Sequence, residues 1–317
     1  MKIKRMIKAK YQKILLVSTF LMVMASVFVF FVLSSSKIPR RPFVTPNASY
    51  KNWDDILSHP KQITIQAYST GIMQTPVSGI VNLKNEKAKD IQDKIVEVPV
   101  TVAVVHHQEY GSYLIDAGLD SSYTHNPYGN MRGIMVKRFL GKGKQEPNTD
   151  IASILKNENI HIRGVFLTHL HFDHTAGIVD LPKNISYVVG KDEIYTNFRF
   201  FMQSDHLAGL EYLYEIDCSE GIDLPPFGKS IDLFGDGSLW AISSSGHSKG
   251  HVMYFVNGVD EKVLVTGDAC NNQYQFDIEI GPGYFSSDVD QAQKVLNSIK
   301  IFKKAYPEIK LVFGHDI

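Results

Sequence analysis

Four side chains that bind metals stand within six residues of this chain, and this cluster limits the fold and the chemistry more than any other feature. A short apolar strand is predicted over Gly164–Thr168, and directly after it come His169, His171, Asp173 and His174. Alternate residues of an extended segment point the same way, so the first two histidines can share one metal ion. The aspartate and the third histidine come where the chain turns and can face a second ion. Imidazole and carboxylate ligands suit zinc, and also iron, manganese or cobalt.

Two metal ions need further ligands, and we expect them where later strands end, because the carboxyl ends of neighbouring strands converge. Three residues meet this condition: His247 in GHSKGH, Asp268 in TGDA and His315 in FGHD. Each follows a glycine, which lets the backbone turn tightly enough for the side chain to point inward. The strands predicted before them are Leu239–Ser243, Val263–Thr266 and Leu311–Phe313. Five histidines and two aspartates therefore form a candidate site for two divalent ions.

These motifs together resemble those of the metallo-β-lactamase superfamily of metallo-hydrolases, and the resemblance extends over residues 62–317. It implies an α/β fold, a four-layer αβ/βα sandwich. It also implies a division of the ligands between the ions. By position, His169, His171 and His247 hold one metal, Asp173, His174 and His315 hold the other, and Asp268 bridges them.

Two further residues take their roles from the same resemblance. The motif LIDAG is similar to the superfamily's early strand-end aspartate, which makes Asp116 a residue that orients the ligands, or else a simple turn aspartate. In the family only the first histidine of GHSKGH is a ligand. We therefore expect the second, His251, to be a buried hydrogen-bonding residue.

The bridging aspartate narrows the choice within the superfamily, because the true β-lactamases lack it. The last quarter of the chain most resembles the N-acyl homoserine lactone lactonases, while hydroxyacylglutathione-type thioesterases and tRNA-processing nucleases share the seven ligands. The lactonases place a tyrosine three residues after the bridging aspartate, where it helps to polarise the substrate carbonyl. Here that position is Asn271, which is shorter, and Tyr274 is the residue that can reach back instead. This departure bears on lactone specificity and leaves the metal site intact.

The predicted activity is hydrolysis of an ester, lactone or thioester carbonyl by a hydroxide that bridges two divalent ions, with zinc the first choice. A single zinc ion already lowers the pKa of its bound water to about 7. Asp173 is expected to orient the hydroxide and relay its proton as well as to ligate. Residues 119–149 and Phe198–Tyr214 are expected to close the pocket. The second stretch, dense in aromatic residues, suits an acyl tail of a small-molecule substrate or packs in the core.

Two other classes of function stay open. Some relatives hold a di-iron centre for electron transfer, but they carry a glutamate at the position of His171 and an additional flavin domain. A non-catalytic scaffold is the third possibility, although such proteins usually lose ligands and here all seven are present.

The amino terminus is predicted to be a membrane anchor. Residues 14–33 are uncharged, and twenty helical residues span about 30 Å, the hydrocarbon thickness of a bilayer. Residues 1–13 hold six basic residues and no acidic one, which predicts that they stay in the cytoplasm and that the domain of residues 61–317 lies outside it. A signal peptide cut near Ser34–Ser36 is the alternative and would make the protein secreted, but its apolar core usually has about 7–15 residues.

Charge argues against a nucleic-acid partner. The whole chain has 33 basic and 33 acidic residues, so the chain after residue 13 carries a net charge of −6 and does not attract phosphates. The predicted partners are thus a small molecule and the membrane, with the oligomeric state undetermined.

The remaining elements follow from local patterns. Residues 34–60 contain several prolines and no sustained periodicity, which predicts a linker. A hairpin is predicted over Val100–Val105 and Gly111–Asp116, with His106 and His107 exposed near its turn. Helices are predicted over Lys191–Phe201 and Ser287–Lys304, the second with a capping box. Two cysteines, at positions 218 and 270, allow one disulfide at most.

Overall fold

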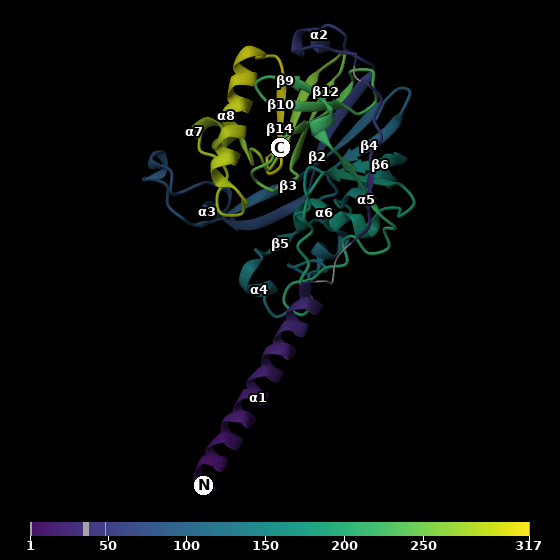
Figure 1. Cartoon of the computed structure of the whole chain (residues 1–317). Helices are drawn as coiled ribbons and strands as arrows, with labels where there is room; N and C mark the ends of the chain where they lie inside the picture. The colour runs from purple at the N-terminus through teal and green to yellow at the C-terminus, as the bar shows by residue number, and fades with distance from the viewer. Residues whose placement is uncertain (1, 34–37, 48, 317) are drawn as a thin grey trace.

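The computed structural model describes residues 2–33, 38–47 and 49–316. Two mixed β-sheets face each other, helices cover their outer faces, and the long helix α1 (Lys2–Leu33) extends away from this body (Figure 1).

The first sheet has eight strands and the second has six. Along the first sheet the order is β1 (Arg40–Pro42), β8 (Leu213–Ile216), β7 (Ser186–Gly190), β6 (Ile162–Phe166), β4 (Gly111–Ile115), β3 (Ile95–His107), β2 (Ile63–Pro76) and β5 (Gly143–Lys144). Along the second it is β14 (Lys310–Phe313), β13 (Lys262–Gly267), β12 (Val252–Asn257), β11 (Leu239–Ser243), β10 (Gly228–Asp232) and β9 (Ile222–Leu224). The α-helices of the body are α2 (Trp53–Leu57), α3 (Val77–Ile80), α4 (Val136–Phe139), α5 (Ile151–Asn157), α6 (Phe172–Thr175), α7 (Gln273–Ile278) and α8 (Val289–Ala305). Single 3₁₀ turns span Glu86–Ala88, Ser121–Thr124, Ala176–Asp180 and Cys218–Glu220.

Strand β11 shows how the layers arise, because successive residues of a strand point to opposite faces. Leu239 and Ala241 face the first sheet and join a core that includes Phe166 of β6. Trp240 and Ile242 face the other way and pack with the buried stripe of α8. On the far side of the first sheet, α5 packs on strands β4 and β6. The four layers are therefore helix, sheet, sheet and helix, which confirms the predicted αβ/βα sandwich.

The predicted carboxyl-terminal helix is present, with a shifted cap. Asp288, not Ser287, caps α8 and accepts a hydrogen bond from the Gln291 backbone nitrogen at 2.9 Å. Ser287 instead donates to the Gly246 carbonyl at 3.1 Å and so ties the start of α8 to the loop after β11.

Part of the predicted linker belongs to the folded body. Residues 34–37 and 48 lie outside the described residues, but Arg40–Pro42 pairs in parallel with β8, and Trp53 and Ile56 of α2 are buried beside α8. A free linker over residues 34–60 is therefore wrong for these two segments. The apolar side chains of α2 complete the outer core of the second sheet, which local periodicity cannot show.

Two smaller predictions also differ from the structure. Lys191–Phe201 is not a helix but a turn followed by irregular chain. His107 is buried, and its Nε2 atom lies 3.0 Å from the Asp236 carboxylate. Cys218 and Cys270 are both free and buried.

Helix α1 contains an apolar stretch, Lys10–Val29, that is long enough to cross a membrane, with a mean hydropathy of 1.9. None of this stretch is buried in the protein. A helix of this length and composition near the amino terminus fits either a membrane anchor or a signal sequence.

Candidate metal centre

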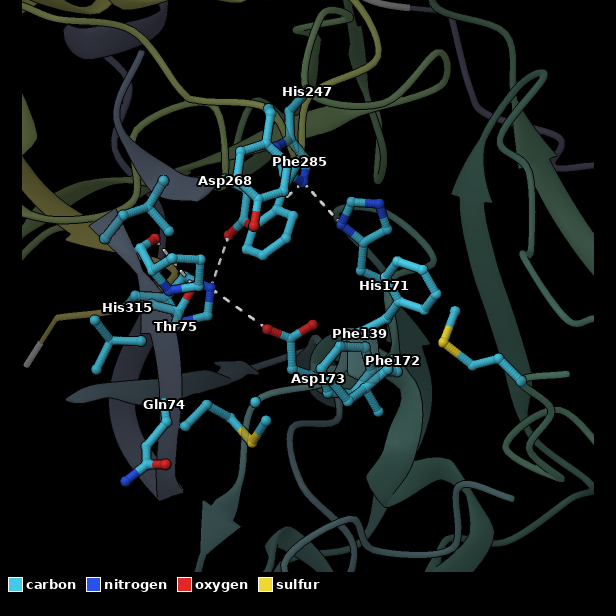
Figure 2. Close-up of a pocket in the computed structure, with 18 of the residues that line it drawn as sticks. Gln74, Thr75, Phe139, His171, Phe172, Asp173, His247, Asp268, Phe285 and His315 are labelled. Carbon is cyan, nitrogen blue, oxygen red and sulfur yellow. Dashed lines mark hydrogen bonds and ion pairs between the residues drawn. The ribbon is translucent and has the colours of Figure 1, made fainter. Parts of the chain in front are cut away.

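The predicted ligands come together at one edge of the sandwich. The loop after β6 carries His169 and His171, helix α6 carries Asp173 and His174, and the loops after β11, β13 and β14 carry one each. Figure 2 shows His171, Asp173, His247, Asp268 and His315 pointing toward a common space. Within the described residues the ligand atoms form two groups, His169, His171, His247 and Asp268, and Asp173, His174 and His315, with the atoms of each group within 4.8 Å of one another.

Asp268 lies between the two groups, and each of its oxygens faces a different one. Oδ2 lies 3.3 Å from Nε2 of His247 and 3.7 Å from Nε2 of His169. Oδ1 lies 3.3 Å from Nε2 of both His174 and His315. The carboxylate thus reaches both groups, although by ligand-atom spacing it falls in the first.

Several of these candidate ligand atoms have no hydrogen-bond partner in the part of the protein that the structure describes. Nε2 of His169, Nε2 of His174 and Oδ1 of Asp268 are buried without a hydrogen-bond partner among the described residues. Each such atom costs about 1–3 kcal/mol when it is left unpaired. A divalent ion beside each group satisfies these atoms, and imidazole with carboxylate is a donor set that such ions accept. The residues present therefore fit a metal centre.

Asp116 orients two of the histidines, His174 directly and His169 through Thr168. It accepts hydrogen bonds from the Thr168 backbone nitrogen at 2.7 Å, from Thr168 Oγ1 at 2.8 Å and from Nδ1 of His174 at 2.8 Å. Because the Thr168 hydroxyl donates to Asp116, it accepts from Nδ1 of His169, 3.0 Å away. Both histidines are thereby held with Nε2 free to face the centre.

The other backing contacts work in the same way. Nδ1 of His315 donates to the Pro99 carbonyl oxygen at 2.9 Å, and Nδ1 of His247 lies 3.2 Å from Oγ of Ser286. A carbonyl oxygen can only accept, so the tautomer of His315 is fixed.

Burial and neighbouring charges divide the histidines by pKa. Burial lowers the pKa of His169 and His247 well below 6.5, which keeps them in the neutral form that binds metals. Burial opposes protonation of His174 and His315 as well, but the surrounding carboxylates together outweigh it and raise both pKa values. Asp268 contributes most, followed by Asp116 for His174 and by Asp173 for His315.

Two of the glycines before the ligands are required, for different reasons. Gly246 has a φ of +144°, and a Cβ there would lie 2.5 Å from the Ala292 backbone nitrogen. At Gly314 the limit is space, because a Cβ would lie 2.5 Å from Oδ1 of Asp268. A side chain at either position would displace the ligand loops.

Glu193 is a buried residue that the sequence analysis missed. Its Oε1 accepts from the Leu170 backbone nitrogen at 3.1 Å, and its Oε2 accepts from Ser248 Oγ at 2.7 Å and from the Gly250 backbone nitrogen at 2.8 Å. One carboxylate thus joins the loop after β6 to the loop after β11. This inward course of the chain explains why no helix forms over Lys191–Phe201.

The structure places His251 behind the centre, buried and hydrogen-bonded. Its Nε2 accepts from the Asp268 backbone nitrogen at 3.2 Å, and its Nδ1 lies 2.7 Å from Ser244 Oγ. Burial lowers its pKa to about 3, so it stays neutral.

A pocket of about 420 Å³ opens over the centre. His171, Asp173, His247, Asp268 and His315 form its floor, and apolar side chains form much of its wall (Figure 2). The two stretches expected to close it both contribute, through residues 138–141 and through Met202.

The two residues expected to assist the substrate carbonyl lie elsewhere. The Asn271 side chain is buried and donates to the Ile80 carbonyl and to Gln275 Oε1, at 3.3 and 3.1 Å. Tyr274 is half exposed and lines a neighbouring hollow with Asn272. Among the described residues, the tyrosine that lines the pocket is Tyr284, which nothing in its local sequence pattern indicated.

Comparison with known proteins agrees with the fold. Residues 95–315 match the family model described as the Metallo-beta-lactamase superfamily. The chain belongs to the metallo-β-lactamase superfamily. It is therefore a metal-dependent hydrolase, and its centre is a site for divalent metal.

The similar proteins include several lactonases. The N-acyl homoserine lactonase AttM of Rhizobium johnstonii is 27% identical over 69% of this chain and 82% of its own length. The probable metallo-hydrolase YflN of Bacillus subtilis is 31% identical over 73% of this chain and 86% of its own. A mutant of B. thuringiensis AiiA, solved with N-decanoyl-L-homoserine at its active site, superposes with a TM-score of 0.62 at 20% identity, covering 81% of this chain and 94% of that one. This last likeness supports the fold alone.

Proposed function

We propose that this superfamily member hydrolyses a lactone carbonyl at a centre of two divalent ions, most simply zinc. The position of Asp268 carries the proposal, because its two oxygens each face a separate group of imidazoles. A carboxylate so placed suits a bridge between two ions. The similarity to AttM lactonases supports the choice of a lactone.

The bound ions supply Lewis acidity, which polarises the carbonyl and makes hydroxide available from water near neutral pH. The residues of the chain do the rest. Asp173 lies on the pocket floor, with Oδ2 3.5 Å from Nε2 of His315, where it can orient the attacking water and accept its proton. The ring C–O bond then breaks, and the same proton passes to the ring oxygen, which leaves as the hydroxyl of the hydroxy-acid product.

The pocket wall suits the acyl part of such a substrate. Phe139, Phe172, Met202 and Phe285 line it, and they offer apolar surface beside the metal ligands. The candidate metal ligands lie on the floor and these apolar side chains on the wall, so a molecule with a polar ring and an apolar tail has one orientation that satisfies both.

We also propose that α1 remains attached and anchors the enzyme, with the catalytic domain outside the cytoplasm. The apolar stretch Lys10–Val29 exceeds the usual core of a cleaved signal peptide, and basic residues precede it. The full chain should then resist carbonate extraction from membranes. Recovery of soluble protein with a new amino terminus near residue 36 would replace the anchor by a cleaved signal.

The decisive experiment for the chemistry is turnover by the full chain on matched lactones, thioesters, phosphodiesters and a β-lactam, together with elemental analysis. We expect the acylated lactone to be opened fastest by a protein that holds two ions per chain. Faster cleavage of a thioester would favour the hydroxyacylglutathione-type alternative, and a fully active protein with one ion would exclude the two-ion centre.

A further inference from the structure

Large apolar side chains are exposed on one part of the surface, around α4. Ile134, Phe139 and Phe200 are 76%, 61% and 59% exposed. The first and third are neighbours, because the Ile134 backbone nitrogen donates to the Phe200 carbonyl at 3.0 Å. Clustered exposure of this kind marks a surface that meets an apolar partner.

These side chains are exposed around helix α4 although the other face of the helix is packed against the protein. Val136 and Leu140 are buried in a small core with Met131, and Phe172 and Met202 pack against it. The helix therefore already has an inner apolar face, and Ile134 and Phe139 form an additional outer one.

This outer face lies where α1 meets the body. The ring of Phe201 contacts that of Phe28, with centroids 6.1 Å apart, and the Met135 backbone nitrogen donates to the Phe201 carbonyl at 2.9 Å. Phe28 is the penultimate residue of the apolar stretch that ends at Val29. Leu33, the last residue of α1, lies five residues further on, so the contact sets the face beside the last turns of the span, and Figure 1 shows α4 beside the end of α1.

The outer face also carries positive charge. Lys137 and Arg138 are exposed on α4 between the two apolar residues. Basic residues beside exposed aliphatic and aromatic side chains are typical of surfaces that bind anionic headgroups while apolar groups enter the interface.

From these contacts we propose that the surface formed by Ile134, Lys137, Arg138, Phe139 and Phe200, here called the membrane face, lies on the bilayer that holds α1. Arg138 and Phe139 also line the pocket over the metal centre. The pocket then opens at the lipid surface and takes amphipathic substrates whose acyl chain resides in the membrane. This inference rests on the proposed anchor but not on the identity of the hydrolysed bond.

A tryptophan reporter tests the membrane face directly. Ile134→Trp places the reporter on the face, and Ile301→Trp is the matched control, because Ile301 is 58% exposed on α8, the helix that covers the second sheet. The native Trp53 and Trp240 are buried and give the same background in both. The full chain is reconstituted in vesicles of phosphatidylcholine and phosphatidylglycerol, with and without spin-labelled lipid.

We expect labelled lipid to quench the added emission of Ile134→Trp and to leave that of Ile301→Trp unchanged. Equal emission from both variants in floating vesicles would overturn the proposal, because the domain would then stand clear of the bilayer. A blue-shifted but unquenched signal at position 134, with cross-linking between chains, would assign the face to a second copy instead. A chain that no longer floats and has lost α1 would refute the anchor and this inference together, while the substrate panel would still decide the chemistry.

Substrate access has its own test. Ile134→Glu with Lys137→Glu alters the face at two residues outside the pocket. We expect the KM for a long-chain form of the substrate that the panel identifies to rise in vesicles, while kcat and the KM for its short-chain soluble form stay unchanged. An Ile301→Glu control should change neither, and an unchanged KM for the long-chain substrate in the double variant would contradict entry from the membrane.

Discussion

The two groups of ligands differ in what stands behind them. His169 and His247 are backed by the hydroxyls of Thr168 and Ser286, which can donate or accept. His174 and His315 are backed by the Asp116 carboxylate and the Pro99 carbonyl, which only accept. A histidine behind a pure acceptor has its tautomer fixed, whereas one behind a hydroxyl depends on what that hydroxyl does elsewhere. The comparison teaches that Asp116 orients a histidine in each group, because it binds His174 directly and fixes the Thr168 hydroxyl that contacts His169.

Removing the residue that the groups share should have the largest effect. We expect Asp268→Ala to lower metal occupancy in both groups and to reduce turnover by more than the roughly 10–100-fold typical of losing a residue behind a ligand. Elemental analysis and steady-state kinetics measure this. Two ions and wild-type turnover in the variant would remove Asp268 from the centre.

A matched pair separates the groups. We expect His247→Ala and His315→Ala each to retain one ion per chain, and the double variant to retain none, because each histidine belongs to a different group. Metal content after dialysis is the measurement. A single variant that has already lost every ion would show that the seven residues hold one ion or two inseparable ones.

The residues behind the ligands give a smaller, asymmetric effect. Asp116→Asn should weaken metal binding by about 10–100-fold in both groups, since it contacts His174 directly and His169 through Thr168. Thr168→Val should weaken only the ion held by His169. Competition with a chelator resolves the two ions. Identical curves for these variants would contradict the central place of Asp116.

Glu193→Gln should have the smallest effect, on the connection between the ligand loops. An amide nitrogen would face the Ser248 hydroxyl and the Gly250 N–H, which donate to Glu193 in the wild type. We expect the free energy of unfolding to fall by about 1–3 kcal/mol. Denaturant unfolding of the metal-loaded protein measures it, with Asp192→Asn as an exposed neighbouring control. Equal stability of the two variants would show that the connection contributes nothing.

The sequence was most informative where a function depends on consecutive residues. His169, His171, Asp173 and His174 lie in one short segment, and the other three candidate ligands each follow a glycine after an apolar strand. The structure brings all seven together, and it places Asp116 behind two of them. Such patterns are local, so they can be recognised without the fold.

Contacts between distant segments could not be foreseen in the same way. Glu193 lies in a stretch with helical periodicity, and only the fold places it between two loops. Asn271 forms its bonds with Ile80 and Gln275, while Asn272 caps α7, so Tyr274 follows a helical path away from the centre. Trp53 and Ile56 read as parts of a linker because the core that buries them comes from the other end of the chain.

Strand β1 has a further consequence for where the enzyme acts. Six residues separate the end of α1 at Leu33 from Arg40, and fully extended they reach about 20 Å. If α1 is held in a bilayer, this short connection keeps β1, and with it the first sheet, close to the membrane. The active site then reaches only substrate in a thin layer above the lipid, so the rate in a vesicle suspension follows the total membrane area rather than the volume of the solution.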